Sequence, residues 1–96
     1  MHRIRVPDDV AALLRSLHPG LKKKARAALR LLSADPLAGK ALRDDLEGLR
    51  SYRVGRFRII YRISVKKILE IIAVGPRKII YEETLRLLKR ASGRKP

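Results

Sequence analysis

The spacing of the apolar residues changes near Arg50, and this change restricts the possible folds more than any other feature. Before it, apolar side chains recur at helical intervals of three and four residues. After it they alternate, in segments 50–54, 57–63 and 67–74 that are rich in β-branched and aromatic residues. Helices followed by a run of neighbouring strands are typical of an α+β domain with an antiparallel sheet. We therefore expect a three-stranded meander in the second half of the chain.

The first half of the chain is predicted to form a short strand and a helical hairpin. Residues 2–6 alternate between polar and apolar side chains, as a strand does. Pro7 and two aspartates then begin a helix, because proline fits the first turn and carboxylates complement the positive helix N-terminus. The proline and glycine within 18–20 end this helix, and a second amphipathic helix is predicted over about 21–33.

The remaining segments complete a single domain. Residues 37–48 are predicted to be an irregular connection, and about 78–91 a final amphipathic helix. We expect one domain over residues 1–91, with the helices largely on one face of the sheet, followed by a basic tail at 92–96. No apolar run is long enough to cross a membrane, and the N-terminus is not that of a signal peptide. We therefore expect a cytoplasmic protein.

A glycine predicts the register of the first two strands of the meander. Gly55 followed by Arg56 suits a two-residue type II′ turn, whose first position requires a positive φ. This turn produces three cross-strand pairs: Val54 with Phe57, Arg53 with Arg58, and Tyr52 with Ile59. One face of the hairpin then carries an apolar set, namely Tyr52, Val54, Phe57, Ile59, Tyr61 and Ile63.

The opposite face carries two arginines directly across from each other. It is predicted to hold Ser51, Arg53, Arg58, Ile60 and Arg62, together with Leu69, Ile71 and Ala73 of the third strand. Like charges at paired positions destabilise a sheet, so Arg53 opposite Arg58 costs stability. Two guanidinium groups on a rigid sheet suit a phosphate, which arginine binds with two parallel hydrogen bonds. The alternative is that both side chains simply extend into water.

The charge of the chain predicts a polyanionic partner. There are 24 Lys+Arg against 9 Asp+Glu, a formal net charge of +15. Residues 1–49 carry +4 (10 basic, 6 acidic) and residues 50–96 carry +11 (14 basic, 3 acidic), so we expect the second half to meet the partner. The absence of cysteine excludes disulfides and thiolate chemistry, and two scattered histidines do not make a metal site. No metal or other cofactor is expected.

Two segments of the second half resemble a known family. Residues 46–63 read LEGLRSYRVGRFRIIYRI, and residues 73–83 read AVGPRKIIYEE. Both are similar to the RelE/ParE superfamily of toxins from toxin–antitoxin systems, and the likeness covers nearly the whole chain. The resemblance implies a RelE-like fold and an antitoxin as partner. Its RelE branch implies a ribosome-dependent endoribonuclease that cuts mRNA, whereas its ParE branch implies a protein that binds and poisons DNA gyrase.

The resemblance also implies which residues act. The positions that match the RelE pattern are Arg53, Arg58, Arg77 and Tyr81. A further basic residue of that pattern falls on Ser51 here, and Arg56 in the turn is a candidate replacement. Retention of the other positions favours the ribonuclease over the gyrase inhibitor. A non-toxic nucleic-acid-binding protein of the same fold is the third alternative.

RNA cleavage of this type begins with attack of a 2′-hydroxyl on the adjacent phosphate. Arginines directed at the non-bridging oxygens would stabilise the charge that develops there. Arg58 and Arg77 are the candidates for this role, and Arg53 is the candidate for orienting the scissile phosphate.

Tyr81 is the favoured proton-transfer residue, and its alternative is a structural tyrosine with a hydrogen-bonded hydroxyl. Glu82 and Glu83 are rival bases, although carboxylates at the start of a helix more often complement its dipole. His2 lies at the terminus and His18 in a helix break, so neither is expected to act.

Further basic side chains are expected to contact RNA or the ribosome. They are Arg56, Arg62, Lys22, Lys23, Lys24, Arg26 and Arg30. The five on the second helix form its basic side, for which the alternative is a plain solvated surface.

Overall fold

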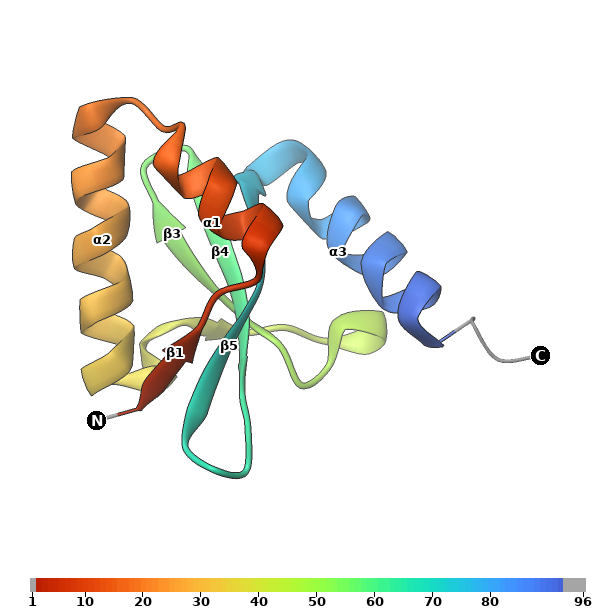
Figure 1. Cartoon of the computed structure of the whole chain (residues 1–96). Coiled ribbons are helices and arrows are strands. Elements are labelled where there is room, and N and C mark those ends of the chain that lie inside the picture. Colours follow the sequence, from red (N-terminus) through yellow and green to blue (C-terminus); the bar gives the residue numbers. More distant parts are fainter. Residues whose placement is uncertain (1, 93–96) are drawn as a thin grey trace.

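The computed structural model describes residues 2–92, without the side chains of residues 77, 78 and 90–92. Its helices are α1 (Asp8–Arg15), α2 (Pro19–Ala34) and α3 (Arg77–Ser92), with the short 3₁₀ turns η1 (Pro36–Ala38) and η2 (Asp44–Leu46). Its strands are β1 (Arg3–Arg5), β2 (Lys40–Ala41), β3 (Arg50–Val54), β4 (Phe57–Ile63) and β5 (Ile68–Pro76). They form a five-stranded sheet in the order β1-β5-β4-β3-β2 (Figure 1). The predicted α+β order of strand, helical hairpin, meander and final helix is confirmed.

The sheet is mixed rather than purely antiparallel. β3, β4 and β5 form the predicted antiparallel meander. β1 runs parallel to β5, with Ile4 beside Leu69, and β2 pairs antiparallel with β3. β2 lies within 37–48, which the sequence pattern assigns to an irregular connection, because a strand of two residues is too short to show alternation.

The β3–β4 hairpin has the register predicted from its turn. Gly55 has a φ of +60° and Arg56 does not have a positive φ, as a type II′ turn requires. Arg53 faces Arg58, and Tyr52 faces Ile59. The two arginines therefore lie on adjacent strands, on the sheet face opposite to α1 and α2.

A bulge in β5 changes which residues share that face. Ile60 of β4 pairs with Ala73, whereas the next residue, Tyr61, pairs with Ile71, so β5 contains one extra residue between the two pairs. An extra residue reverses the alternation of side chains along the strand. Leu69 and Ile71 accordingly join the core under α1 and α2, and of the three residues predicted for the arginine face only Ala73 lies on it. The assignment of Leu69 and Ile71 to the arginine face is wrong for this reason.

Two apolar layers enclose the sheet. α1 and α2 cover one face, where Leu32 and Tyr61 are fully buried. α3 covers part of the opposite face, where Ile80 packs with Ile60 (Figure 1). The expectation that the helices lie largely on one face is wrong for α3, because the second face has an apolar patch of its own to bury. Ile63, assigned to the core face, is 37% exposed, since the end of the β4–β5 hairpin extends beyond the helices.

α2 begins earlier than the sequence pattern indicates. Pro19 is its first residue, and Nδ1 of His18 accepts a hydrogen bond from the Gly20 N–H at 3.1 Å. The proline and glycine that separate the two helices in sequence therefore form the first turn of α2, where proline needs no donor. α3 continues to Ser92, and residues 93–96 of the predicted basic tail lie outside the described residues. Among the described helices, none has the length and apolar character needed to cross a bilayer.

A buried tyrosine attaches the segment before β2 to the centre of the sheet. The Tyr61 hydroxyl donates to the Pro36 carbonyl at 2.6 Å and accepts from the Gly39 N–H at 2.9 Å. The Arg50 guanidinium donates to the carbonyls of Gly39 and Leu37. Burial raises the pKa of Tyr61 above its usual value, and the hydrogen bond from Gly39 and the charge of Arg50 oppose this rise without cancelling it.

Alanine at position 39 is expected to destabilise the fold. A Cβ at Gly39 would overlap the Tyr61 side chain, and overfilling of a packed site typically costs about 1–3 kcal/mol. Gly20→Ala is the matched control, because its Cβ would make only ordinary contacts with His18. We expect urea denaturation to give a lower free energy of unfolding for Gly39→Ala and no such loss for the control. Equal values for the two variants would contradict the close packing at Gly39.

The buried phenol also predicts how stability depends on pH. Because the pKa of Tyr61 is raised in the folded protein, its neutral form contributes fully below the unfolded pKa of about 10. That contribution is lost as the pH rises through the folded pKa. The free energy of unfolding of the wild type should therefore fall relative to that of Tyr61→Phe above about pH 10. Urea denaturation across this range measures the difference, and parallel pH profiles would show that the tyrosine does not contribute in this way.

Candidate nucleic-acid interface

Arg53, Arg58 and Gly75 form a row across β3, β4 and β5. Arg58 lies between the other two, paired with Arg53 on one side and with Gly75 on the other. Arg53 is exposed and Arg58 half-buried, and neither forms an ion pair with a described carboxylate. The Arg53 Nε donates to the Gly55 carbonyl at 3.3 Å, which holds this guanidinium beside the turn. The structure thus brings together two uncompensated guanidinium groups, next to a position without a side chain.

Gly75 also lets α3 approach the sheet closely. A Cβ at this position would lie 3.1 Å from Cδ1 of Ile80, closer than side chains normally pack. Glycine therefore allows the start of α3 to lie directly against the end of β5, beside the arginine row.

Tyr81 follows Ile80 on α3, and a hydrogen bond holds it on the arginine face. Its hydroxyl oxygen lies 3.2 Å from Oγ of Ser51, which is only 3% exposed. Ser51 precedes Arg53 by two residues on β3, so the two share a face at a spacing of about 7 Å. The sequence pattern marks Ser51 only as a missing basic residue, and nothing local indicates that it contacts a residue 30 positions away.

Arg77 is the first residue of α3 and comes two residues after Gly75. Its backbone therefore begins the helix at the end of the arginine row. Its side chain lies outside the described ones, so its predicted role stays a prediction.

The two glutamates after Tyr81 are exposed and lie in the second turn of α3 rather than at its start. Glu83 and Tyr81 are two residues apart, which places them on nearly opposite sides of the helix. Glu83 lines a hollow together with Asp9 of α1, away from Ser51. The geometry therefore favours Tyr81 over Glu83 as the group facing the arginine row.

Arg62 lies on the same face, farther along β4, and is already paired. Its Nε donates to the Glu70 carboxylate at 2.7 Å, and Arg5 of β1 approaches the same carboxylate at 3.4 Å. The charge of Arg62 is thus partly compensated, unlike that of Arg58. Arg56 is exposed in the hairpin turn. The described residues contain no cluster of three or more His, Cys, Asp or Glu side chains that would hold a metal ion.

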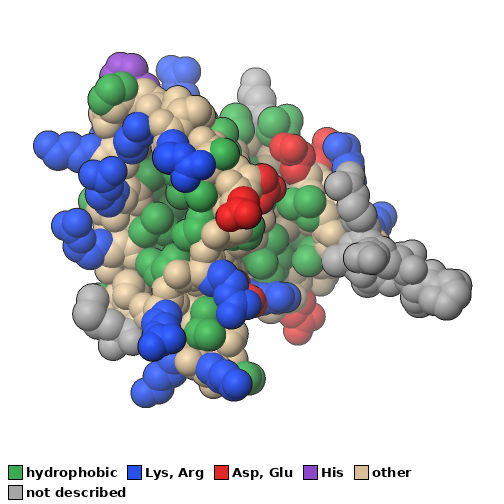
Figure 2. Space-filling model, in the orientation of Figure 1, with side chains coloured by type: hydrophobic (Ala, Val, Ile, Leu, Met, Phe, Trp, Pro, Cys, Tyr) green, Lys and Arg blue, Asp and Glu red, His purple; other side chains and the backbone are tan. Residues whose placement is uncertain are grey.

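The basic side of α2 lies apart from this row. Lys23, Lys24, Arg26 and Arg30 are exposed and Lys22 is half-buried. Figure 2 shows basic side chains along the side of the molecule that α2 forms. Because α2 packs on the opposite face of the sheet from α3, its cations and the arginine row belong to separate surfaces.

Comparison with solved structures finds several similar toxins. The toxin–antitoxin complex RelBE2 from Mycobacterium tuberculosis includes a chain that is 32% identical, with 79% of this chain and 98% of that one covered and a TM-score of 0.69. A chain of the archaeal RelE–RelB complex from Pyrococcus horikoshii OT3 is 24% identical over 79% and 94% of the two chains, with a TM-score of 0.65. The isolated E. coli RelE toxin shares the fold at 16% identity, 92% and 99% coverage and a TM-score of 0.68. No curated protein sequence matches significantly.

A family model identifies the chain more directly. The model for the ParE toxin of the type II toxin–antitoxin system, parDE, matches residues 5–81, which include the helical hairpin, the whole meander and Tyr81. The chain therefore belongs to this family and is a RelE/ParE superfamily toxin of a type II toxin–antitoxin system.

Proposed function

We propose that this toxin is a ribosome-dependent endoribonuclease that cuts mRNA. The observation that carries the proposal is the arginine row, with Tyr81 on the same face of the sheet. The two guanidinium groups lack carboxylate partners among the described residues, so they are available to bind phosphate. The structural likeness to RelE toxins supports the same branch of the superfamily.

In the proposed reaction, the 2′-oxygen forms a bond to the adjacent phosphorus and the bond from phosphorus to the 5′-oxygen breaks. Arg58 and Arg77 stabilise the negative charge on the non-bridging oxygens, and Arg53 orients the phosphate. The Tyr81 hydroxyl gives its proton to the leaving 5′-oxygen, and the proton of the 2′-hydroxyl passes through water to restore the phenol. Tyr81 carries the proton transfer, and Ser51 holds its hydroxyl over the sheet.

The ribosome is the polyanion that this function requires. With a net charge of +15, the chain is strongly attracted to ribosomal RNA. A docking surface for ribosomal RNA, separate from the reacting phosphate, is supplied by the exposed cations Lys23, Lys24 and Arg30 of α2. Arg56, exposed in the hairpin turn, is a further contact for RNA. Since ribosomes and mRNA are cytoplasmic, the toxin acts there. Its activity is controlled by its antitoxin.

The second candidate function is inhibition of DNA gyrase by binding. The family model, which describes a ParE toxin, is the observation that favours it. In that case the arginine row would contact a protein or DNA without breaking a bond. Intact mRNA together with stalled replication in cells expressing the toxin would select this alternative.

Arg58→Ala is expected to abolish most cleavage. Removing one group that stabilises transition-state charge typically costs about 10²–10³ in rate, so purified ribosomes programmed with mRNA should be cut that much more slowly. Binding to ribosomes should change little. Arg5→Ala is the matched control, because Arg5 lies on the same sheet face but forms a weak ion pair with Glu70. Wild-type cleavage by both Arg58→Ala and Arg77→Ala would show that the proposed active site is wrong.

Tyr81→Phe is expected to lose less activity than Arg58→Ala, on the order of tenfold to a hundredfold, since water can partly replace a proton carrier.

If Ser51 acts only by positioning Tyr81, then Ser51→Ala should also slow cleavage. The double variant should be no slower than Tyr81→Phe alone, because the two residues act as one unit. Additive losses would contradict this coupling. An unchanged cleavage rate for Tyr81→Phe would show that Tyr81 does not transfer the proton, and Glu82 or Glu83 would then be the candidate base.

A further inference from the structure

The end of the β4–β5 hairpin carries cations that have no carboxylate partner. Lys66 and Lys67 lie in the connection between the two strands, and the Arg3 N–H of β1 donates to the Lys67 carbonyl at 3.1 Å. All three side chains are exposed, and none forms an ion pair with a side chain that the structure describes. Figure 2 shows basic side chains gathered at the lower end of the molecule, where this hairpin projects beyond the helices. Residues 64–67 and Arg3 are called the hairpin end below.

Lys67 adopts a backbone conformation that favours glycine. Its φ is +59°. Its N–H donates to the Ser64 carbonyl at 3.3 Å, and the Ser64 N–H donates to the Ile68 carbonyl at 2.7 Å. In short hairpin loops the left-handed position is usually glycine, because a Cβ there is strained. The chain thus keeps a lysine where glycine would be more stable, and such departures tend to mark functional positions.

The shape of the hairpin end favours one kind of polyanion. β1 pairs with β5 as far as Arg3 and Ile68, so three strands lie side by side and span about 10 Å between the outer two. With their side chains they are too wide for either groove of B-form DNA, of about 6 and 12 Å. Residues 3–5 and 62–68 contain no aromatic side chain on which an unpaired base could stack. An RNA helix, by contrast, offers a wide, shallow minor groove bordered by phosphates.

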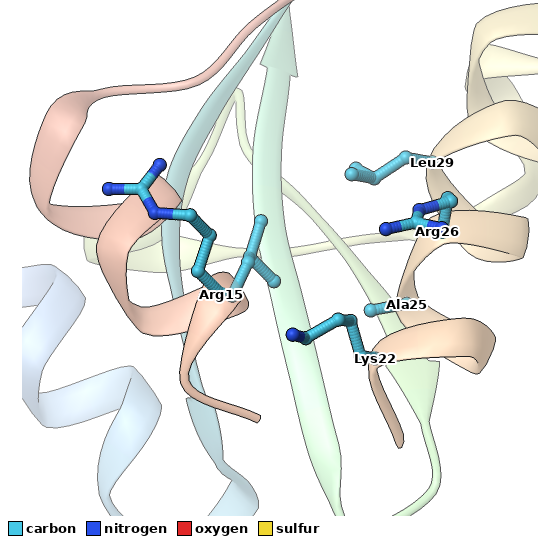
Figure 3. A pocket seen from close by; sticks show the side chains of 6 residues that line it. Arg15, Lys22, Ala25, Arg26 and Leu29 are labelled. Atoms are coloured by element: carbon cyan, nitrogen blue, oxygen red, sulfur yellow. The ribbon is translucent and has the colours of Figure 1, made fainter. Parts of the chain in front are cut away.

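Cations between α1 and α2 have different surroundings. Lys22 and Arg26 border a hollow of about 130 Å³, whose lining includes Ala25 and Leu29. Figure 3 shows these two cations extending from α2 toward α1, whereas the Arg15 guanidinium points away from both. A hollow of this size admits a single side chain but no part of a nucleic-acid helix. The projecting hairpin end is therefore the better match for such a helix.

We propose that the hairpin end binds the minor groove of an RNA helix. Arg3, Lys66 and Lys67 contact the phosphates that border the groove, and Val65, which is 98% exposed, lies against the riboses between them. The choice of RNA rests on the proposed function, since the ribosome offers such helices. The site itself is separate from the arginine row, because Arg58 lies at the opposite end of β4. Binding at the hairpin end therefore requires no cleavage.

The test measures binding of the full chain to a fluorescein-labelled RNA duplex of about 16 base pairs, the length that double-stranded RNA-binding domains span. Fluorescence anisotropy is recorded between about 0.05 and 0.2 M salt, without ribosomes. The variant Arg3→Gln/Lys66→Gln should bind at least about tenfold more weakly than the wild type at the lower salt concentrations. The slope of log K against log salt should become shallower by about two, because two phosphate contacts are lost.

The matched control is Lys40→Gln/Arg43→Gln, which also removes one exposed lysine and one exposed arginine. Lys40 lies on β2, at the opposite edge of the sheet, and Arg43 follows it closely. This control should bind the RNA duplex within about threefold of the wild type, with the same slope. Equal losses of affinity and slope in the two double variants would indicate general charge attraction and overturn the proposal.

Two further nucleic acids test the assignment to an RNA helix. A DNA duplex of the same sequence and single-stranded oligouridine should each bind the two double variants with affinities that agree within about threefold. If the hairpin-end variant loses as much affinity for either of them as for the RNA duplex, the assignment to an RNA helix is wrong. Arg58→Ala should bind the RNA duplex like the wild type, so this result is independent of whether the toxin cuts mRNA.

Lys67→Gly separates binding from folding. Glycine adopts a positive φ without strain, so this variant should unfold at a higher urea concentration than the wild type. It should nevertheless bind the RNA duplex at least about threefold more weakly, with a slope shallower by about one. Because the variant is expected to be the more stable protein, unfolding does not explain such a loss. Wild-type affinity for the RNA duplex in Lys67→Gly would overturn the proposal.

Discussion

The extra residue in β5, between the partners of Ile60 and Tyr61, determines how the rest of the molecule is arranged. Before the extra residue, the odd-numbered Leu69 and Ile71 face α1 and α2. After it, the odd-numbered Ala73 and Gly75 lie on the opposite face, on the side of α3. A strand without the bulge would place Ala73 and Gly75 in the layer under α1 and α2. The position beside Arg58 would then carry a side chain, and α3 would have no glycine against which to pack. The bulge thus lets β5 contribute apolar side chains to both layers, and it leaves the end of the arginine row open.

The arginine row is where the sequence departs most clearly from what stability alone would select. Arg53 and Arg58 face each other on paired strands, and no described carboxylate compensates them. On the same face, Arg62 shows the stabilising alternative, because Glu70 lies beside it in the next strand. Local conflicts of this kind in natural proteins tend to mark functional sites. Arg58 and Arg62 lie on the same strand, and only Arg62 has a carboxylate partner among the described residues. Arg58 is therefore the better position at which to test a functional role.

The register of the hairpin was predictable because the information is local. Gly55 specifies the turn, the turn specifies the pairing, and the pairing places Arg53 opposite Arg58. The bulge was not predictable in this way, since residues 71–74 are all apolar and each of them suits either face. The hydrogen bond between Ser51 and Tyr81 joins distant segments, and it depends on how α3 lies against the sheet. The close packing of α3 against the sheet depends in turn on Gly75. From the sequence alone, this glycine indicates only the end of a strand.

The two edges of the sheet have a consequence for how the chain behaves at high concentration. The outermost strands, β1 and β2, are three and two residues long. Arg3 and Arg5 lie on one edge and Lys40 on the other. An edge strand that is short and positively charged is a poor template for a strand of another copy, because few backbone groups are free and the charges repel. At β1 and β2, the short length and the positive charge therefore both disfavour edge-to-edge pairing with another copy of the chain.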